Sequence, residues 1–215
     1  MKTTVKITAL LMLVSFITFS TYAGSGKDPQ ATLNAKAARQ ARQEAKKYVK
    51  DGYYPAPGAL PIETQLQNAW LKTGEVDEKG FQKYIVETGN SVAETQTAAK
   101  LQATETAKLS IAGAIQTNIA ALIENNIANM QLNNEDAASV TKTVAASKGL
   151  IAQELGRTIP LVELYKKVGK NVQADIRLAY DYKTAMETSK QVIRKQLENE
   201  TKILQDKLDE LLKSK

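Results

Sequence analysis

The sequence contains no cysteine and no histidine, and these absences remove the side chains used most often for nucleophilic catalysis and metal binding. Without cysteine there are no disulfides, thiolate nucleophiles or iron–sulfur ligands. Without histidine there is no histidine-based triad and no zinc site of the usual kind. We therefore expect stability to come from packing. We predict no cofactor and no metal site, and any metal would have to be a hard cation bound by oxygen.

Long hydrophobic runs are confined to the N-terminus. Lys2 and Lys6 begin an apolar run over residues 7–19, and small residues end it at Ala23. The run is too short to cross a bilayer comfortably, which takes about 20 residues. We predict a secretory signal over residues 1–23 that is cleaved after Ala23; a retained N-terminal anchor is the alternative. Because no cysteine follows the run, we expect an unlipidated protein in the periplasm or at the outer-membrane periphery.

The net charge of +6 becomes +4 when Lys2 and Lys6 leave with the signal, an ordinary value that does not indicate nucleic-acid binding. Residues 31–50 are rich in alanine, which predicts a helix. Its only acidic residue is Glu44, and its basic residues are Lys36, Arg39, Arg42, Lys46, Lys47 and Lys50. Since its apolar side is mostly alanine, we favour a solvated helix that rests on the domain. A membrane-surface or partner-binding helix is the alternative.

A connector rich in proline, glycine and tyrosine follows at residues 51–61. A short helix is then predicted over residues 62–72, and the only tryptophan, Trp70, lies on its apolar face. Tyr53 and Tyr54 lie beside prolines in the connector. We favour an interpretation in which these tyrosines hold the connector against the surface. The alternative is a small aromatic site, in which Tyr53, Tyr54 and Trp70 bind a small ligand or a cell-wall fragment.

The chain is organised around a strand, a turn and a long helix. Residues 81–87 are rich in aromatic and β-branched side chains, which predicts a strand, and residues 88–91 predict a turn. From about Glu94, apolar residues recur every three or four positions, which predicts an amphipathic helix of up to about ten turns. The apolar stripe is alanine in its first half, which should lie flat on a neighbouring element, and isoleucine and leucine in its second half. A close backbone crossing would explain Gly113, and simple tolerance would explain it equally well.

The next segment predicts a helix and then β structure. Asn133 begins a helix that runs to about residue 148. Residues 150–155 and 158–166 predict two strands, or one bulged strand, with Pro160 at an edge or a bulge. Residues 172–180 alternate between apolar and polar side chains. This pattern predicts a half-buried strand that forms a hairpin with the preceding strand.

Asp181 can cap a last helix that runs to about residue 212. Its distal leucines are spaced four and three apart, but two heptads are too few for a coiled coil. Acidic residues predominate in this tail, so we predict that it packs on the basic helix 31–50, in its own chain or in a neighbouring one. The predicted contact residues are Arg39, Arg42 and Lys46 on the basic helix and Leu204, Leu208 and Leu211 on the tail.

Together these elements predict an α+β fold. Its β-α-β-β-α core has a small antiparallel sheet backed by long helices, with helical extensions at both ends. The predicted units are the signal peptide over residues 1–23; the basic helix, Pro/Tyr loop and short helix over residues 24–80; the α+β core over residues 81–196; and a C-terminal helical extension over residues 197–215.

The run Tyr84-Ile-Val-Glu-Thr-Gly89 and the helix that contains Ala103 and Ala107 resemble the strand and alanine-spaced helix of a bacterial envelope family. These are the LPP-twenty-like lipoproteins and the related N-terminal domain of flagellar assembly protein T. The later strand 172–180 is also similar, and the resemblance in texture and order covers roughly residues 81–190. It implies an exported, outer-membrane-associated, non-catalytic protein. The chain departs from the family because it lacks the lipidated cysteine.

Two short motifs match elements of serine acyltransferases that act on the cell wall. Ser139-Val-Thr-Lys142 matches Ser-x-x-Lys, and Lys72-Thr-Gly74 matches Lys-Thr-Gly. A lysine one helical turn from a serine could accept its proton. However, the two motifs occur in the reverse order and Ser-Asp-Asn is missing, so we assign no catalytic residue.

The sequence therefore favours a non-catalytic, exported envelope protein. We expect it to contact other envelope proteins, or to self-associate, through its terminal helices. A binding module for a small ligand or a cell-wall fragment is the alternative, and a cell-wall hydrolase is a third interpretation. We expect no nucleic acid and no integral membrane span after signal cleavage, whereas peripheral contact with a membrane stays open.

Overall fold

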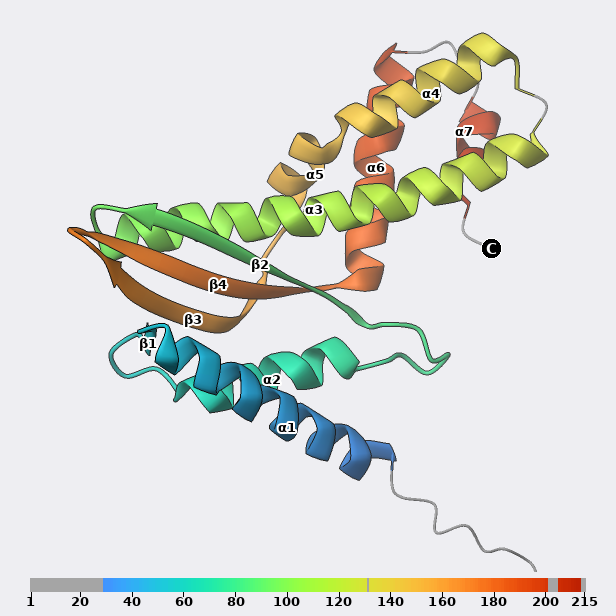
Figure 1. Ribbon diagram of the computed structural model, residues 1–215. Coiled ribbons are helices and arrows are strands. Elements are labelled where there is room, and N and C mark those ends of the chain that lie inside the picture. The colour runs from blue at the N-terminus through green and yellow to red at the C-terminus, as the bar shows by residue number, and fades with distance from the viewer. Residues whose placement is uncertain (1–28, 131, 201–204, 214–215) are drawn as a thin grey trace, which may run out of the picture.

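The computed structural model describes residues 29–130, 132–200 and 205–213, and Figure 1 shows their arrangement. Two helices cover one face of an antiparallel sheet, a long helix covers the other face, and the remaining helices gather around its distal half. In chain order the elements are α1 (Pro29–Lys50), β1 (Tyr54–Pro55), α2 (Ile62–Gly74), β2 (Tyr84–Ala93), α3 (Gln96–Asn129), α4 (Asn134–Ala146), α5 (Lys148–Glu154), β3 (Ile159–Val168), β4 (Asn171–Asp181), α6 (Tyr182–Glu200) and α7 (Gln205–Leu211).

The sheet has four strands in the order β1-β3-β4-β2, and every neighbouring pair is antiparallel. The predicted α+β fold is therefore confirmed. The hairpin of β3 and β4 is also confirmed, and the pairing shifts between Pro160 and Val162, which places a bulge at the predicted proline. The short strand β1 was not predicted; it extends the sheet from within the proline- and tyrosine-rich connector.

The alanine half of α3 lies flat on the sheet, as predicted. Ala99, Ala103 and Ala107 are fully buried there. The predicted turn at residues 88–91 is wrong, because β2 continues through them with unbroken pairing to β4. Gly89 allows the backbone of β2 to lie close to that of α3 and does not form a turn. A Cβ atom there would overlap the Ala103 carbonyl oxygen and the Ala107 nitrogen.

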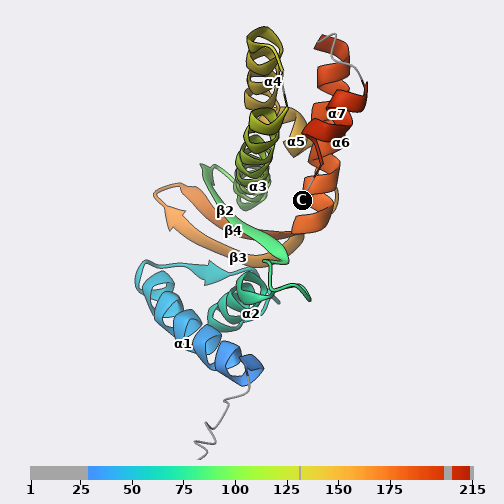
Figure 2. The same ribbon diagram turned by 90° about the vertical axis from the view of Figure 1, so that its right-hand side faces the viewer.

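The isoleucine half of α3 leaves the sheet and forms a helical end with α4 to α7. Seen from the side in Figure 2, α3 with α4 and α6 with α7 form two neighbouring stacks. Ile115, Ile119 and Ile123 join the core of the sheet to the buried side chains of this end. Gly113 does not mark a backbone crossing, because a Cβ atom there would meet only the Lys148 side chain, 3.2 Å from its Cε.

Two predictions for the second half of the chain are wrong. Residues 150–155 do not form a strand, since most of them belong to the helix α5. The last helix is also not continuous to residue 212. Arg194 and Asp209 form an ion pair, although 15 residues along one helix would separate them by about 22 Å.

The C-terminal helix α7 packs on α3. Leu208 and Leu211 are fully buried in the main core, and Leu204 lies outside the described residues. The Asn126 amide nitrogen donates to the carbonyl oxygens of Glu210, Leu211 and Lys213 at 3.3, 2.8 and 3.1 Å. Docking of the tail on α1 of the same chain is therefore wrong, because α1 lies on the opposite side of the sheet (Figure 1).

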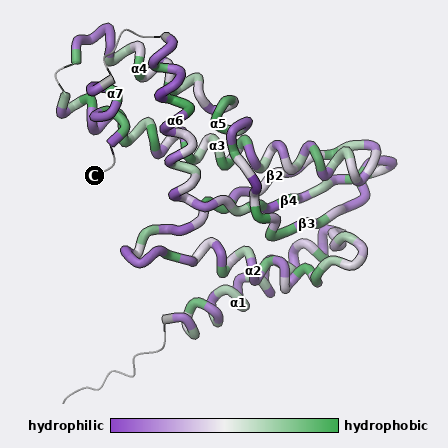
Figure 3. Tube along the Cα trace, turned by 180° about the vertical axis from the view of Figure 1, so that it is seen from behind, coloured by the Kyte–Doolittle hydropathy of each residue, from purple (hydrophilic) through white to green (hydrophobic). Residues whose placement is uncertain are grey.

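The layer of α1 and α2 covers the face of the sheet away from α3. Ala41, Ala45 and Leu66 form a second apolar cluster with side chains of β3. The predicted half-burial of β4 is wrong, because this layer also covers its polar side and leaves Asp175 only 8% exposed. Figure 3 shows that hydrophobic residues recur along the strands and α3, and that hydrophilic residues recur along α1. Within the described part of the chain, no helix is both long and apolar enough to cross a membrane.

Candidate functional site

The helix α1 buries three of its alanines and exposes its cations. Ala37, Ala41 and Ala45 are buried, as the interpretation of a helix resting on the domain requires. The exposed side carries all six basic residues of the helix: Lys36, Arg39, Arg42, Lys46, Lys47 and Lys50. Arg42 forms an exposed ion pair with Glu63 of α2 at 3.3 Å. All charged side chains on the exposed side of α1 are therefore cations, and we call these six residues the basic face.

A network of polar side chains joins α1 to the sheet. Glu44 accepts a hydrogen bond from the Arg177 guanidinium on β4 at 2.6 Å, and the Arg177 side chain is only 15% exposed. Arg177 also donates to the hydroxyl oxygen of Thr88 on β2 at 3.1 Å. The second carboxylate oxygen of Glu44 accepts the indole N–H of Trp70 at 2.8 Å. One acid of α1 therefore connects α1, α2, β4 and, through Arg177, β2.

A second polar contact lies next to this network. The Tyr48 hydroxyl donates to an Asp175 carboxylate oxygen at 3.2 Å. Burial raises the pKa of Asp175, and the nearby Tyr48 and Arg177 only partly offset it. Burial also raises the pKa of Tyr48, and the charge of Asp175 adds to that shift. Both groups therefore favour their neutral forms more strongly than they would in water.

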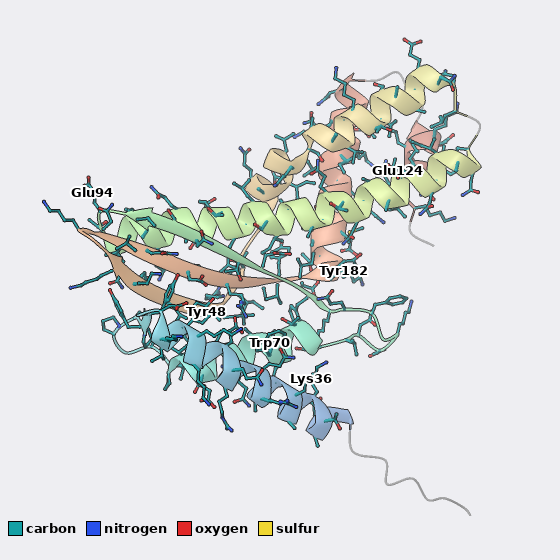
Figure 4. All side chains as sticks on the ribbon, in the orientation of Figure 1. Lys36, Tyr48, Trp70, Glu94, Glu124 and Tyr182 are labelled. Atoms are coloured by element: carbon teal, nitrogen blue, oxygen red, sulfur yellow. The ribbon has the colours of Figure 1, made fainter. Side chains whose placement is uncertain are left out.

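Trp70 lies at the junction of two cavities along one side of α1. The larger cavity, of about 420 Å³, is lined by Gln40, Gln43, Glu44, Lys47, Tyr48, Asp51 and Trp70. The smaller, of about 240 Å³, is lined by Leu33, Lys36, Ala37, Gln40, Trp70, Thr73 and Gly74. Gln40 and Trp70 contribute to both. Figure 4 labels Tyr48 on α1 and Trp70 on α2, in the layer that covers the face of the sheet away from α3. We call the two cavities together the Trp70 groove.

The predicted aromatic site is only partly present. Tyr53 packs edge to face on Tyr48, with ring centres 5.0 Å apart, and Tyr54 lies 6.3 Å from the ring centre of Tyr165. Neither Tyr53 nor Tyr54 lines the Trp70 groove. The structure therefore keeps these two tyrosines apart from Trp70 and places Tyr48 of α1 in the groove instead.

The motifs that resemble acyltransferase elements are not brought together. Ser139 and Lys142 lie on α4 in the helical end, whereas Lys72 lies on α2 on the other side of the sheet (Figure 1). Lys72 is engaged by Glu75 at 2.8 Å and lies over the Tyr84 ring. In the described ranges, no group of three or more acidic side chains could hold a metal ion.

Sequence reasoning missed the residues that hold the groove together. The partners Glu44 and Arg177 are 133 positions apart, and so no local pattern links them. One signal was available: Glu44 is the only acid in a strongly basic helix. Asp175 and Arg177 also stood out as charged residues in the most regular strand, but alternation alone could not show that another layer covers them.

Comparisons with known proteins add no identification. A scan against protein-family models found no match, and searches of curated proteins and of solved structures found none either. The resemblance to the envelope lipoproteins therefore stays a prediction.

Proposed function

We propose that this protein is an exported, non-catalytic protein of the bacterial cell envelope that binds an acidic partner protein through the basic face of α1. The observation that carries the proposal is the distribution of charge. Six basic residues and one acidic residue give α1 a formal charge of +5, whereas the whole chain has +6. The other 193 residues are therefore almost neutral in sum, and the positive potential is concentrated on one helix.

The cations of the basic face are available to a partner. Arg39, Lys46 and Lys50 are seven and four positions apart, a spacing that places them on one stripe of the helix. All three are exposed, and within the described residues none of them forms an ion pair with an acid of the chain. The one acid of α1, Glu44, is turned inward onto Arg177 and Trp70. The charges of these three cations are therefore not neutralised by ion pairs within the described residues.

The shape of α1 favours docking on a surface without insertion. Its apolar side is already used against α2 and the sheet, where Ala41 is fully buried. A helix that inserts into a bilayer needs a free apolar face with large side chains. Lys36 and Lys50 are 14 positions apart, so the face extends about 21 Å. An acidic protein surface of matching length would meet several cations at once, which favours fast, salt-dependent association.

The experiment is a crosslinked pull-down from intact cells that express the full chain. The test variant is Arg39→Gln/Lys46→Gln/Lys50→Gln, and the matched control is Lys79→Gln/Lys142→Gln/Lys207→Gln. The control residues are exposed cations outside α1, and both variants remove three charges. We expect the same acidic protein to be captured with the wild type and the control, and to be lost with the test variant.

Two results would contradict the proposal. Equal capture by both triple variants would show that the basic face is not the contact. A partner that is captured equally at low and at high salt would show that charge does not drive the association. Mass measurement of the secreted form tests the export half of the proposal separately, since it shows whether the chain begins after Ala23.

A further inference from the structure

The Trp70 groove has features that the basic face does not explain. A buried or half-buried ion pair contributes little net stability, because the cost of removing both charges from water offsets much of their attraction. Yet Glu44 is paired with Arg177 at 2.6 Å, and its second oxygen accepts the indole N–H of Trp70 at 2.8 Å. The result of this arrangement is a fixed aromatic wall. Thr88, which bonds to Arg177, anchors the chain of contacts in β2.

The lining of the groove is polar but close to neutral. The carboxylate of Glu44 is matched by Arg177, and the charges of Lys47 and Asp51 have opposite signs. Gln40 and Gln43 offer amide groups that both donate and accept hydrogen bonds. The smaller cavity adds one cation, Lys36, whereas a charged ligand would find no unmatched charge of opposite sign in the larger cavity. A neutral ligand with many hydroxyl or amide groups would find partners for them.

We propose that the Trp70 groove binds a neutral saccharide. A sugar ring has an apolar C–H face that packs on an indole, and a rim of hydroxyl groups that amides and carboxylates can recognise. The larger cavity, at about 420 Å³, is in the range of small-ligand sites. The smaller cavity continues it past Trp70 toward Leu33. Leu33 and Asp51 are 18 positions apart, a length of about 27 Å, which suits a short oligosaccharide better than a single sugar.

The groove shares Lys36 and Lys47 with the basic face, but the three cations changed in the test of the protein contact lie outside it. Arg39, Lys46 and Lys50 line neither cavity. The triple variant of the basic face should therefore bind saccharide as the wild type does. A failure of the saccharide site would leave the proposed protein contact intact, and the reverse also holds.

The chain contains one tryptophan, so its fluorescence reports on the groove alone. The full chain is titrated with N,N′-diacetylchitobiose and with cellobiose, two neutral disaccharides that differ in their acetamido groups. We expect a saturable change in Trp70 fluorescence with at least one of them. Binding by diacetylchitobiose alone assigns an acetamido contact, and equal binding by both assigns recognition of hydroxyl groups and ring faces. No saturable change with either disaccharide would overturn the proposal.

Matched variants locate the binding. Gln43→Ala removes an exposed amide from the larger cavity and should weaken binding about tenfold, the effect of losing one good hydrogen bond. Gln67→Ala removes the same group from α2 outside both cavities and should leave the affinity unchanged. Equal affinities in the two variants, or equal weakening, would show that the saccharide does not occupy the groove.

Discussion

Replacing Gly89 with alanine should strongly destabilise the fold, because the backbones of β2 and α3 leave no room for a Cβ atom at this residue. The new Cβ would overlap two backbone atoms of α3, the Ala103 oxygen and the Ala107 nitrogen. Backbone atoms in the middle of a helix cannot rotate away as the end of a side chain can. The helix would have to move off the sheet and would weaken the packing of Ala99, Ala103 and Ala107.

The expected loss is about 3 kcal/mol of unfolding free energy, at the upper end of the usual cost of overpacking. For a chain of this size, that corresponds to a fall in Tm of about 6–12 °C. Urea denaturation followed by circular dichroism measures the first quantity, and a thermal scan measures the second. Both should be made on the Gly89→Ala variant and the wild type side by side.

Gly113→Ala is the matched control, because it makes the same substitution at a glycine within α3 itself. Its Cβ would meet only the flexible end of Lys148, at 3.2 Å. Alanine is preferred to glycine inside a helix by about 1 kcal/mol, so this variant should be slightly more stable than the wild type. The reasoning would be refuted if Gly89→Ala were as stable as the wild type, or if both variants lost the same free energy.

Three further predictions follow from buried polar groups. Burial raises the folded-state pKa of Asp175 above its ordinary value of 3.8, so the folded protein binds the proton more tightly than the unfolded chain does. The contribution of Asp175 to the free energy of unfolding should therefore be largest below that ordinary value and fall as the pH rises through the raised pKa. Asp175→Asn should remove this pH dependence in urea titrations between about pH 3 and pH 8. The same pH dependence in the variant and the wild type would contradict the prediction. The Ser189 hydroxyl is fully buried and has no hydrogen-bond partner among the described residues, so Ser189→Ala should stabilise the protein by about 1 kcal/mol. Ser147→Ala is the comparison: its hydroxyl donates to the Val144 carbonyl at 2.7 Å, and its loss should destabilise by a similar amount. Asn126→Ala removes three hydrogen bonds to the end of α7 and should increase hydrogen exchange there, with no increase in β4.

The sequence predicted those elements whose hydrophobic period is long and regular. The helix α3 was predicted because its apolar residues keep a 3.6-residue period over 34 residues, and β4 because it alternates along its length. Alternation tells which side chains share a face, but not whether a second layer covers the polar face. The burial of Asp175 therefore could not be predicted, because the covering layer comes from α1 and α2 more than 100 positions earlier.

The errors arose where the local sequence is compatible with two structures. A short apolar run such as residues 150–154 fits a buried strand or a short helix, and its contacts with α3 and α6 decide for the helix α5. A glycine in a polar stretch predicts a turn, but Gly89 serves a close contact within a strand. Of the predicted site residues, Trp70 lines the proposed groove, whereas Tyr53 and Tyr54 do not. Tyr48 also lines the groove but was not predicted, because its place there depends on how α1 lies on the sheet.

The length of α3 has a consequence for how the molecule loses its structure. Its 34 residues extend about 51 Å. Its first half packs on the sheet, and its second half packs in the helical end. Because both regions pack on the same helix, unfolding of either region removes the packing contacts of half of α3. The stabilities of the two regions are therefore coupled. The protein should therefore come apart in one cooperative step, with no stage at which only one region is folded.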